Sequence, residues 1–149
     1  MDILAQGKIE EQKAFEALSD KYIVDDRRDW WKQHDKPYAM DFYLPHTKLA
    51  IDFKFKGIKK EYNTFALNFE HFTKYMHYFN TQEGIDKAIL WYKDCHTGNE
   101  YSLDLKDLEA AIYNQTIKLR YSSQHKKQWE SGCFFGIPLS LFDNFSIDF

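Results

Sequence analysis

The sequence predicts a layered α/β or α+β fold built around a mixed β-sheet. Segments with a helical period alternate along the chain with segments of strand character, in the order helix, strands, helix, strand, helix, strand. Residues 88–92 form a continuous apolar run, which is typical of a strand buried on both faces in the middle of a sheet. A chain of 149 residues can bury one core, so we expect a single domain over residues 1–149.

The first predicted element is a helix over residues 4–21. Its core-facing stripe follows the helical period and places an acidic residue among apolar ones, at Leu4, Glu11, Phe15, Leu18 and Tyr22. A carboxylate is therefore expected on the side of this helix that faces the core. The neighbouring Glu10 could take this place instead, so the choice between the two glutamates stays open.

A β-hairpin is predicted next. Residues 38–44 have the aromatic content of a strand, residues 45–47 form a turn, and residues 48–56 alternate strictly between two faces. One face of the second strand is apolar and consists of Leu49, Ile51, Phe53 and Phe55. The other face consists of Ala50, Asp52, Lys54 and Lys56. Asp52 and Lys54 are therefore expected to point the same way.

The remaining elements follow from caps and periodicity. Asn68 is a plausible N-cap for a helix that packs through Phe72, Tyr75, Met76 and Phe79. Residues 87–93 form the buried strand, and residues 94–99 turn the chain back. Asp104 caps a short helix, and residues 133–141 are a further strand candidate.

The composition excludes several functional classes. Twenty basic and 23 acidic residues give a net charge of −3, so any nucleic-acid contact must come from local patches. No apolar run could span a bilayer and the N-terminus lacks a signal peptide, so we expect a cytoplasmic protein without membrane contact. Cys95 and Cys133 form no C-x-x-C pair, and we expect two buried thiols.

Three acidic residues and a lysine are predicted to converge. Hydrolysis of a phosphodiester needs hard oxygen ligands for Mg²⁺ and a cation that offsets charge on the phosphate. We interpret Asp41, Asp52 and the backbone carbonyl of Phe53 as ligands of Mg²⁺, for which Mn²⁺ could substitute. Glu11 would reach the metal through a water molecule. Lys54 would orient the attacking water and offset the charge on the scissile phosphate.

A structural interpretation of the same residues competes with this one. Asp52 and Lys54 could form an exposed ion pair on a solvated strand face, where a lysine matters little for folding. Asp41 could be an exposed hairpin residue, and Glu11 could lie at the border of an amphipathic helix.

The motifs resemble the PD-(D/E)XK nuclease superfamily, whose core is a helix, a hairpin bearing Asp and (Asp/Glu)-x-Lys, a second helix and another strand. Five segments carry the resemblance over about residues 7–104: Gly7-x-x-x-Glu11, residues 40–43, Asp52-Phe53-Lys54, residues 63–71 and residues 84–92. The first is similar to the start of Holliday-junction resolvases, and the last two stretches are similar to RecU-type resolvases. Met40 replaces the usual proline, and Phe72 replaces an expected glutamine.

The resemblance implies a restriction-endonuclease-like core, a central mixed β-sheet flanked by helices in α-β-β-β-α-β order, with residues 105–149 as a C-terminal extension. It implies a Mg²⁺-dependent DNA endonuclease, related in kind to RecU-type and archaeal Holliday-junction resolvases. Cutting two strands with one site per chain favours a homodimer or a higher homo-oligomer. The alternatives are a sequence-specific restriction or homing endonuclease on the same core, and a non-catalytic DNA- or protein-binding relative, which the acidic composition favours.

Several side chains near the site are predicted to contact DNA: Lys56, Lys59, Lys60, His71 and Lys74. A solvated loop would explain Lys59 and Lys60 equally well. A second basic run, consisting of Lys118, Arg120 and residues 125–127, could also contact the DNA backbone or form a plain loop. The pair Trp30-Trp31 could stack on bases, although aromatic packing is the commoner use.

Overall fold

The computed structural model describes residues 2–30, 40–121 and 132–149. The described elements are, in chain order, α1 (Ile3–Ser19), β1 (Asp25–Asp26), β2 (Phe42–Leu44), β3 (Leu49–Lys56), β4 (Thr64–Asn68), α3 (Phe69–Thr81), β5 (Lys87–Asp94), β6 (Glu100–Asp104), α4 (Leu105–Tyr113), β7 (Leu119–Tyr121), β8 (Cys133–Pro138), a 3-10 turn (Leu139–Leu141) and β9 (Asp143–Asn144). No described helix combines the length and the apolar character that crossing a bilayer requires.

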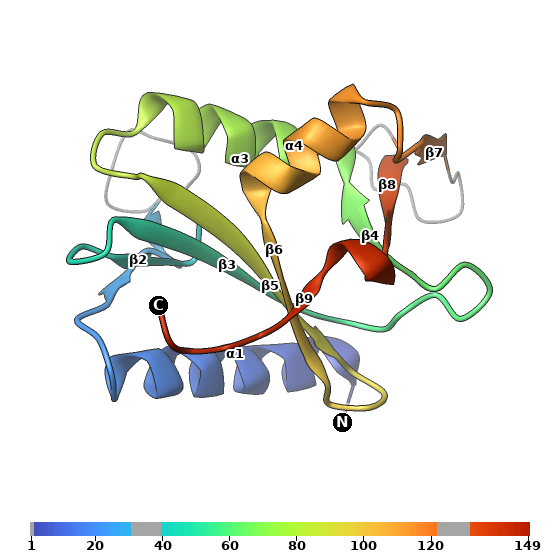
Figure 1. Cartoon of the computed structure of the whole chain (residues 1–149). Helices are drawn as coiled ribbons and strands as arrows, with labels where there is room; N and C mark the ends of the chain where they lie inside the picture. The colour runs from blue at the N-terminus through green and yellow to red at the C-terminus, as the bar shows by residue number, and fades with distance from the viewer. Residues whose placement is uncertain (1, 31–39, 122–131) are drawn as a thin grey trace.

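A six-stranded mixed sheet forms the centre of the molecule, with strand order β1-β2-β3-β5-β6-β9. Strands β3 and β5 run parallel and the other neighbours are antiparallel. Helix α1 covers one face of this sheet, and α3 and α4 cover the other (Figure 1). The predicted class, a restriction-endonuclease-like α/β core with a mixed sheet flanked by helices, is confirmed. The elements α1, β2, β3, β4, α3 and β5 follow the order α-β-β-β-α-β, and the two-residue strand β1, which was not expected, lies between α1 and β2.

Strand β3 separates two apolar clusters, and its residues alternate between the two faces as predicted. Ile51 and Phe53 pack with Leu18 of α1 in one cluster, whereas Ala50 belongs to the cluster under α3 and α4. The predicted N-caps are also confirmed, because the side chains of Asn68 and Asp104 accept hydrogen bonds from the first turns of α3 and α4. These caps fix where both helices begin.

A second, three-stranded antiparallel sheet has the order β4-β8-β7. Strand β4 is not apparent from the sequence, because residues 64–68 lead directly into the helix cap and no turn separates the two elements. The strand predicted over residues 133–141 ends at Pro138, where a 3-10 turn follows. The C-terminal extension thus supplies β7 and β8 to this sheet and β9 to the large one.

Three expectations about burial and strand bounds were wrong. The core face of α1 consists of Glu10, Ala14 and Leu18, whereas Leu4 is 80% exposed because the first turn of α1 does not pack against the sheet. Strand β2 begins only at Phe42; residues 38 and 39 of the predicted strand lie outside the described residues. Cys95 and Cys133 are free thiols, but both are only partly buried.

Candidate active site

The candidate active site lies beside β3 at the point where β2 begins. The last rung between the two strands joins Phe42 to Ile51. Beyond it, the backbone N–H of Phe53 donates a hydrogen bond of 2.9 Å to Oδ2 of Asp41. The N–H and the C=O of one strand residue point to the same edge, so the Phe53 carbonyl also faces this side, where the described chain adds no further rung. Asp41 and the Phe53 carbonyl therefore share one edge of β3.

Asp52 and Lys54 point together toward α3. Nζ of Lys54 lies 3.3 Å from Oδ2 of Asp52, and the hydroxyl of Tyr75 donates a 2.6 Å hydrogen bond to the same oxygen. The Lys54 ammonium also lies 5.2 Å from the centre of the Tyr75 ring. The side chains of Asp52 and Lys54 are only 6% and 10% exposed, so the alternative of a solvated strand face is wrong. Helix α3 covers both groups.

Asp41 carries the strongest electrostatic strain of the cluster. Its carboxyl group is surrounded by protein, although part of the residue reaches solvent. Burial raises the pKa of Asp41 well above its usual range, and the negative charges of Asp52 and Glu11 raise it further. The Phe53 hydrogen bond and the Lys54 charge act in the opposite direction but do not compensate. The acidic residues are thus brought together against their mutual repulsion.

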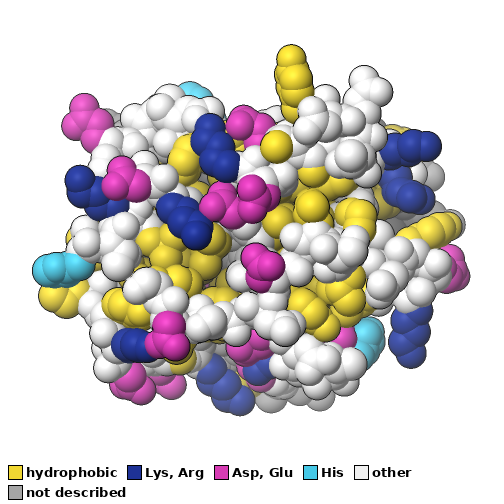
Figure 2. All heavy atoms as spheres, viewed as in Figure 1, with side chains coloured by type: hydrophobic (Ala, Val, Ile, Leu, Met, Phe, Trp, Pro, Cys, Tyr) yellow, Lys and Arg dark blue, Asp and Glu magenta, His cyan; other side chains and the backbone are white. Residues whose placement is uncertain are grey.

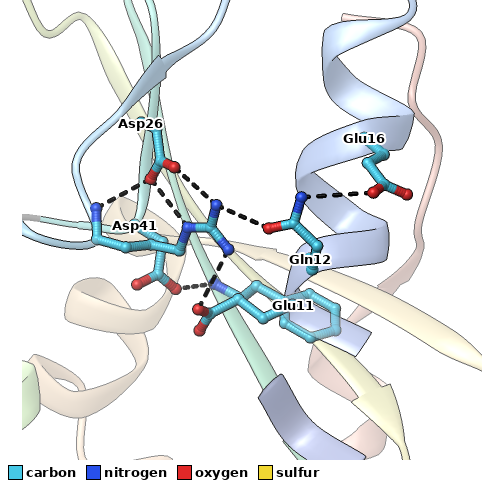
Figure 3. A network of polar contacts seen from close by, with 7 residues as sticks. Glu11, Gln12, Glu16, Asp26 and Asp41 are labelled. Carbon is cyan, nitrogen blue, oxygen red and sulfur yellow. Dashed lines mark hydrogen bonds and ion pairs between the residues drawn. The ribbon is translucent and has the colours of Figure 1, made fainter. Parts of the chain in front are cut away.

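Glu11, and not Glu10, is the glutamate of α1 that faces this cluster. Burial raises the pKa of Glu11, Arg28 opposes this effect, and Asp52 adds to it. In Figure 3, Glu11 and Gln12 project from α1 toward Asp26 and Asp41. The side chain of Glu10 instead accepts a 2.7 Å hydrogen bond from Lys93 of β5. The sequence had left this choice open.

Arg28 joins α1 to β1 and was not predicted as a site residue. Its guanidinium donates to Asp26 at 2.6 Å and to Gln12 at 3.1 Å, and it lies 3.6 Å from Glu11. The dashed lines in Figure 3 mark these contacts. The Asp26 hydrogen bond raises the pKa of Arg28, and the charges of Asp26, Glu11 and Asp41 contribute as well. A charged stretch without helical or strand period was the signal in the sequence, but it did not indicate which partner the arginine would choose.

His71 of α3 lies close to Lys54 and Lys56 of β3. Burial, followed by the charges of Lys54 and Lys56, lowers the pKa of His71 to about 4, so its ring is neutral at physiological pH. Its buried Nδ1 has no hydrogen-bond partner among the described residues. Lys74 is exposed on the same helix and adds to the effect on His71. Tyr75 of this helix was predicted only as a packing residue, and nothing in its spacing indicated that its hydroxyl would reach Asp52.

The donor set suits a hard divalent cation. Two carboxylates and a backbone carbonyl are the oxygen ligands that Mg²⁺ prefers, and a cation would relieve the repulsion that raises the pKa of Asp41. The donor atoms of Glu11, Asp41 and Asp52 do not all lie within 4.8 Å of one another. Among the described residues, one group of three has its potential ligand atoms within this distance of one another: Asp94, Cys95 and His96. The Asp94 carboxylate, however, accepts hydrogen bonds from His96 and Thr97 that close the turn after β5.

The predicted DNA-contact residues divide into two groups. His71 and Lys74 lie on α3 beside the site, whereas Lys56, Lys59 and Lys60 line a groove together with Arg120 of the second basic run. Residues 125–127 of that run and Trp31 lie outside the described residues. The ring of Trp30 packs under the Arg27 guanidinium, 4.4 Å from its centre, as aromatic packing predicts.

Comparison with known proteins identifies a solved structure with a similar fold. No family model and no curated protein matches the sequence. Among solved structures, D212, a nuclease from a fusselovirus, matches with a TM-score of 0.52 at 12% identity, over 95% of this chain and 83% of that chain. The likeness shows that this chain shares the fold of the viral nuclease.

Proposed function

We propose that the protein is a nuclease of the PD-(D/E)XK type that hydrolyses phosphodiester bonds of DNA with Mg²⁺, for which Mn²⁺ could substitute. One observation carries the proposal: Asp41, just before β2, lies beside Asp52 of β3, with Lys54 held 3.3 Å from Asp52. The fold shared with a viral nuclease supports it. The order of a carboxylate just before one hairpin strand and Asp-x-Lys on the next would then serve catalysis.

Each residue of the cluster has a definite role in this proposal. Asp41, Asp52 and the Phe53 carbonyl would hold Mg²⁺, which when bound supplies Lewis-acid activation at the phosphate. The Tyr75 hydroxyl fixes the orientation of the Asp52 carboxylate through its 2.6 Å hydrogen bond. Lys54 stabilises the negative charge that develops on the scissile phosphate and orients the attacking water. Glu11 would act at the border of the site, through water.

The preferred DNA structure is the finer part of the proposal. The segment Gly7-x-x-x-Glu11 and the stretch after Lys54 resemble resolvases, which favours cleavage of four-way junctions. One site per chain would require a homodimer or a higher homo-oligomer to cut both strands.

The decisive experiment compares three DNA substrates: a linear duplex, a random-sequence plasmid and a four-way junction. Each is incubated with Mg²⁺ or with Ca²⁺ and with the wild type or Lys54→Met. Lys93→Met is the matched control, because Lys93 is also a half-buried strand lysine in an ion pair with a glutamate, but lies away from the cluster. We expect Mg²⁺-dependent cleavage that falls by about a thousandfold or more in Lys54→Met and persists in Lys93→Met.

The products decide the finer question. Paired cuts at the junction would support a resolvase, and discrete plasmid fragments would indicate a sequence-specific endonuclease instead. If folded wild-type protein cleaves none of the substrates while it still binds DNA, the proposal fails in favour of a non-catalytic binding protein.

A further inference from the structure

The outer face of the small sheet forms the floor of a groove. Residues directly opposite one another on neighbouring strands share a face. In this sheet Arg120 and Asn68 both lie opposite Phe134, and Ala66 lies opposite Gly136. The other face is buried in the core through Phe65, Leu67, Phe135 and Ile137. Two small residues, Ala66 and Gly136, therefore occupy the centre of the face that points outward.

The groove above this floor has a volume of about 910 Å³ and a basic lining. Lys56, Lys59, Lys60 and Arg120 face a single acidic residue, Glu61, among the described lining residues. Figure 2 shows basic side chains along the edge of the molecule where Figure 1 places β7 and the turn between β3 and β4. This local charge contrasts with the net charge of −3 of the whole chain, so the basic residues are concentrated here.

An exposed tyrosine, Tyr62, lies beside the basic groups. It is 58% exposed, although a tyrosine ring normally buries most of its surface. Tyr121 is also exposed, but it follows Arg120 in β7 and so belongs to the opposite face of that strand. The Arg120 guanidinium lies 4.7 Å from the centre of the Tyr62 ring. A Cβ added to Gly136 would lie 3.4 Å from Nε of Arg120, so the Arg120 side chain extends over this glycine. Flat cationic and aromatic surfaces are thus offered side by side.

The groove is continuous with the candidate active site through β3. Lys56 lines the groove and lies on the same face of the strand as Lys54. Two residues of β-strand span about 7 Å, a distance on the order of one to two nucleotides of a nucleic-acid strand. Asn68, at the floor of the groove, also caps the helix that carries His71. A strand that passes the site would therefore enter the groove within a few nucleotides.

We propose that this groove binds a single-stranded segment of nucleic acid adjacent to the bond that is cut. One of its bases stacks on Tyr62, and its phosphates contact Lys59, Lys60 and Arg120. Stacking on a side chain requires bases that are free of a duplex, which selects single-stranded over double-stranded nucleic acid. The inference rests on the proposed nuclease function for its relation to a scissile bond, but the binding itself needs no catalysis.

The test is a binding titration without divalent cations, so that cleavage cannot contribute. A fluorescent single-stranded oligonucleotide of about 16 nucleotides and a blunt duplex of the same sequence are compared by anisotropy. We expect Tyr62→Ala to weaken binding of the single strand about tenfold or more, and Tyr62→Phe to bind like the wild type. Tyr113→Ala is the matched control, because Tyr113 is an exposed tyrosine at the end of α4 outside the groove, and it should change nothing.

Salt dependence separates stacking from phosphate contact. Arg120→Ala should reduce the slope of log affinity against log salt by about 0.7, the value for one phosphate contact on a single strand. Tyr62→Ala should leave this slope unchanged while it lowers the affinity. Wild-type affinity for the single strand in Tyr62→Ala, or an equal loss for the duplex, would overturn the inference.

The two proposals fail separately. Binding that depends on Tyr62, in a protein that cleaves no DNA, would refute the nuclease and retain the groove. Cleavage that depends on Lys54, with single-strand affinity unaffected by Tyr62→Ala, would retain the nuclease and refute the groove.

Discussion

Glu10 and Glu11 are neighbours on α1, yet their surroundings differ in kind. Glu10 is buried and accepts hydrogen bonds from Lys93 at 2.7 Å and from Gln6 at 3.0 Å, and the Lys93 hydrogen bond in particular lowers the pKa of Glu10. Glu11 lies partly buried among acidic groups, and burial raises its pKa despite the nearby Arg28. The hydrogen bonds of Glu10 therefore favour its ionised form. Arg28 does the same for Glu11, but it does not outweigh the effect of burial.

This difference separates a structural carboxylate from a functional one. A fully hydrogen-bonded ion pair stabilises the fold, whereas a cluster of carboxylates with raised pKa values destabilises it in the absence of a cation. Proteins retain such unfavourable clusters mainly at functional sites, where stability and activity conflict. If the interpretation is right, substitutions in the two regions should have opposite effects.

The largest expected effect is that of Asp41→Asn. The amide oxygen can still accept the Phe53 hydrogen bond, but the substitution removes one charge from the acidic cluster and one ligand from the proposed metal site. We expect Mg²⁺-dependent cleavage to fall by about a thousandfold or more. Because repulsion is relieved, the melting temperature of the metal-free protein should rise near neutral pH by about 2–4 °C. A lower melting temperature would contradict the assignment of strain to this cluster.

Tyr75→Phe should have a smaller effect on the same cluster. It removes only the hydroxyl that orients Asp52, and loss of such an outer hydrogen bond typically weakens metal binding about tenfold or more. The Mg²⁺ concentration for half-maximal cleavage should rise accordingly, while cleavage at saturating Mg²⁺ stays near that of the wild type. Tyr92→Phe is the control, because this buried hydroxyl donates to the Ala66 carbonyl instead. Equal metal dependence in Tyr75→Phe and the wild type would remove Tyr75 from the site.

The pair Glu10→Gln and Glu11→Gln tests the comparison directly. Glu10→Gln should lower the free energy of unfolding by about 1 kcal/mol, because Lys93 loses its closest anionic partner, and should leave cleavage unchanged. Glu11→Gln should reduce cleavage about tenfold and change stability by less than about 0.5 kcal/mol. Denaturant unfolding and cleavage rates of both variants provide the measurement. A cleavage defect confined to Glu10→Gln would reverse the two roles.

The smallest effect is a pH dependence of stability. A raised pKa of Asp41 means that the folded protein binds a proton at a higher pH than the unfolded chain does, so stability rises as the pH falls through that pKa. His71 acts in the opposite direction, because its lowered pKa makes stability fall as the pH drops from about 6.5 to about 4.

Asp41→Asn isolates the first contribution. The advantage in melting temperature of this variant over the wild type, measured in a chelating buffer, should shrink as the pH is lowered from neutral toward the ordinary pKa of an aspartate, about 4. An advantage that is independent of pH would indicate that the titration of Asp41 does not contribute.

The sequence predicted the parts of the site that depend on local periodicity. The alternation of β3 placed Asp52 and Lys54 on one face, and the polar cap Asn68 marked the start of α3. The sequence did not predict Arg28 or the hydroxyl role of Tyr75, because their partners lie on other elements and depend on how α1 and α3 pack on the sheet. The sequence also left the choice between Glu10 and Glu11 open, because the partners of both glutamates lie on other elements.

The site also depends on the register in which β3 pairs with its neighbours. Side chains of a strand alternate between faces, so a displacement of β3 by one residue would turn Phe53 toward α3 and Asp52 away from it. The parallel rungs from Leu49–Lys87 to Lys56–Asp94 fix this register along the whole strand. Glu11, Asp41 and Tyr75 come from three further segments of the chain. A partly folded or misregistered chain would therefore lack the site altogether, so the cleavage that we propose would arise only after the whole core has formed.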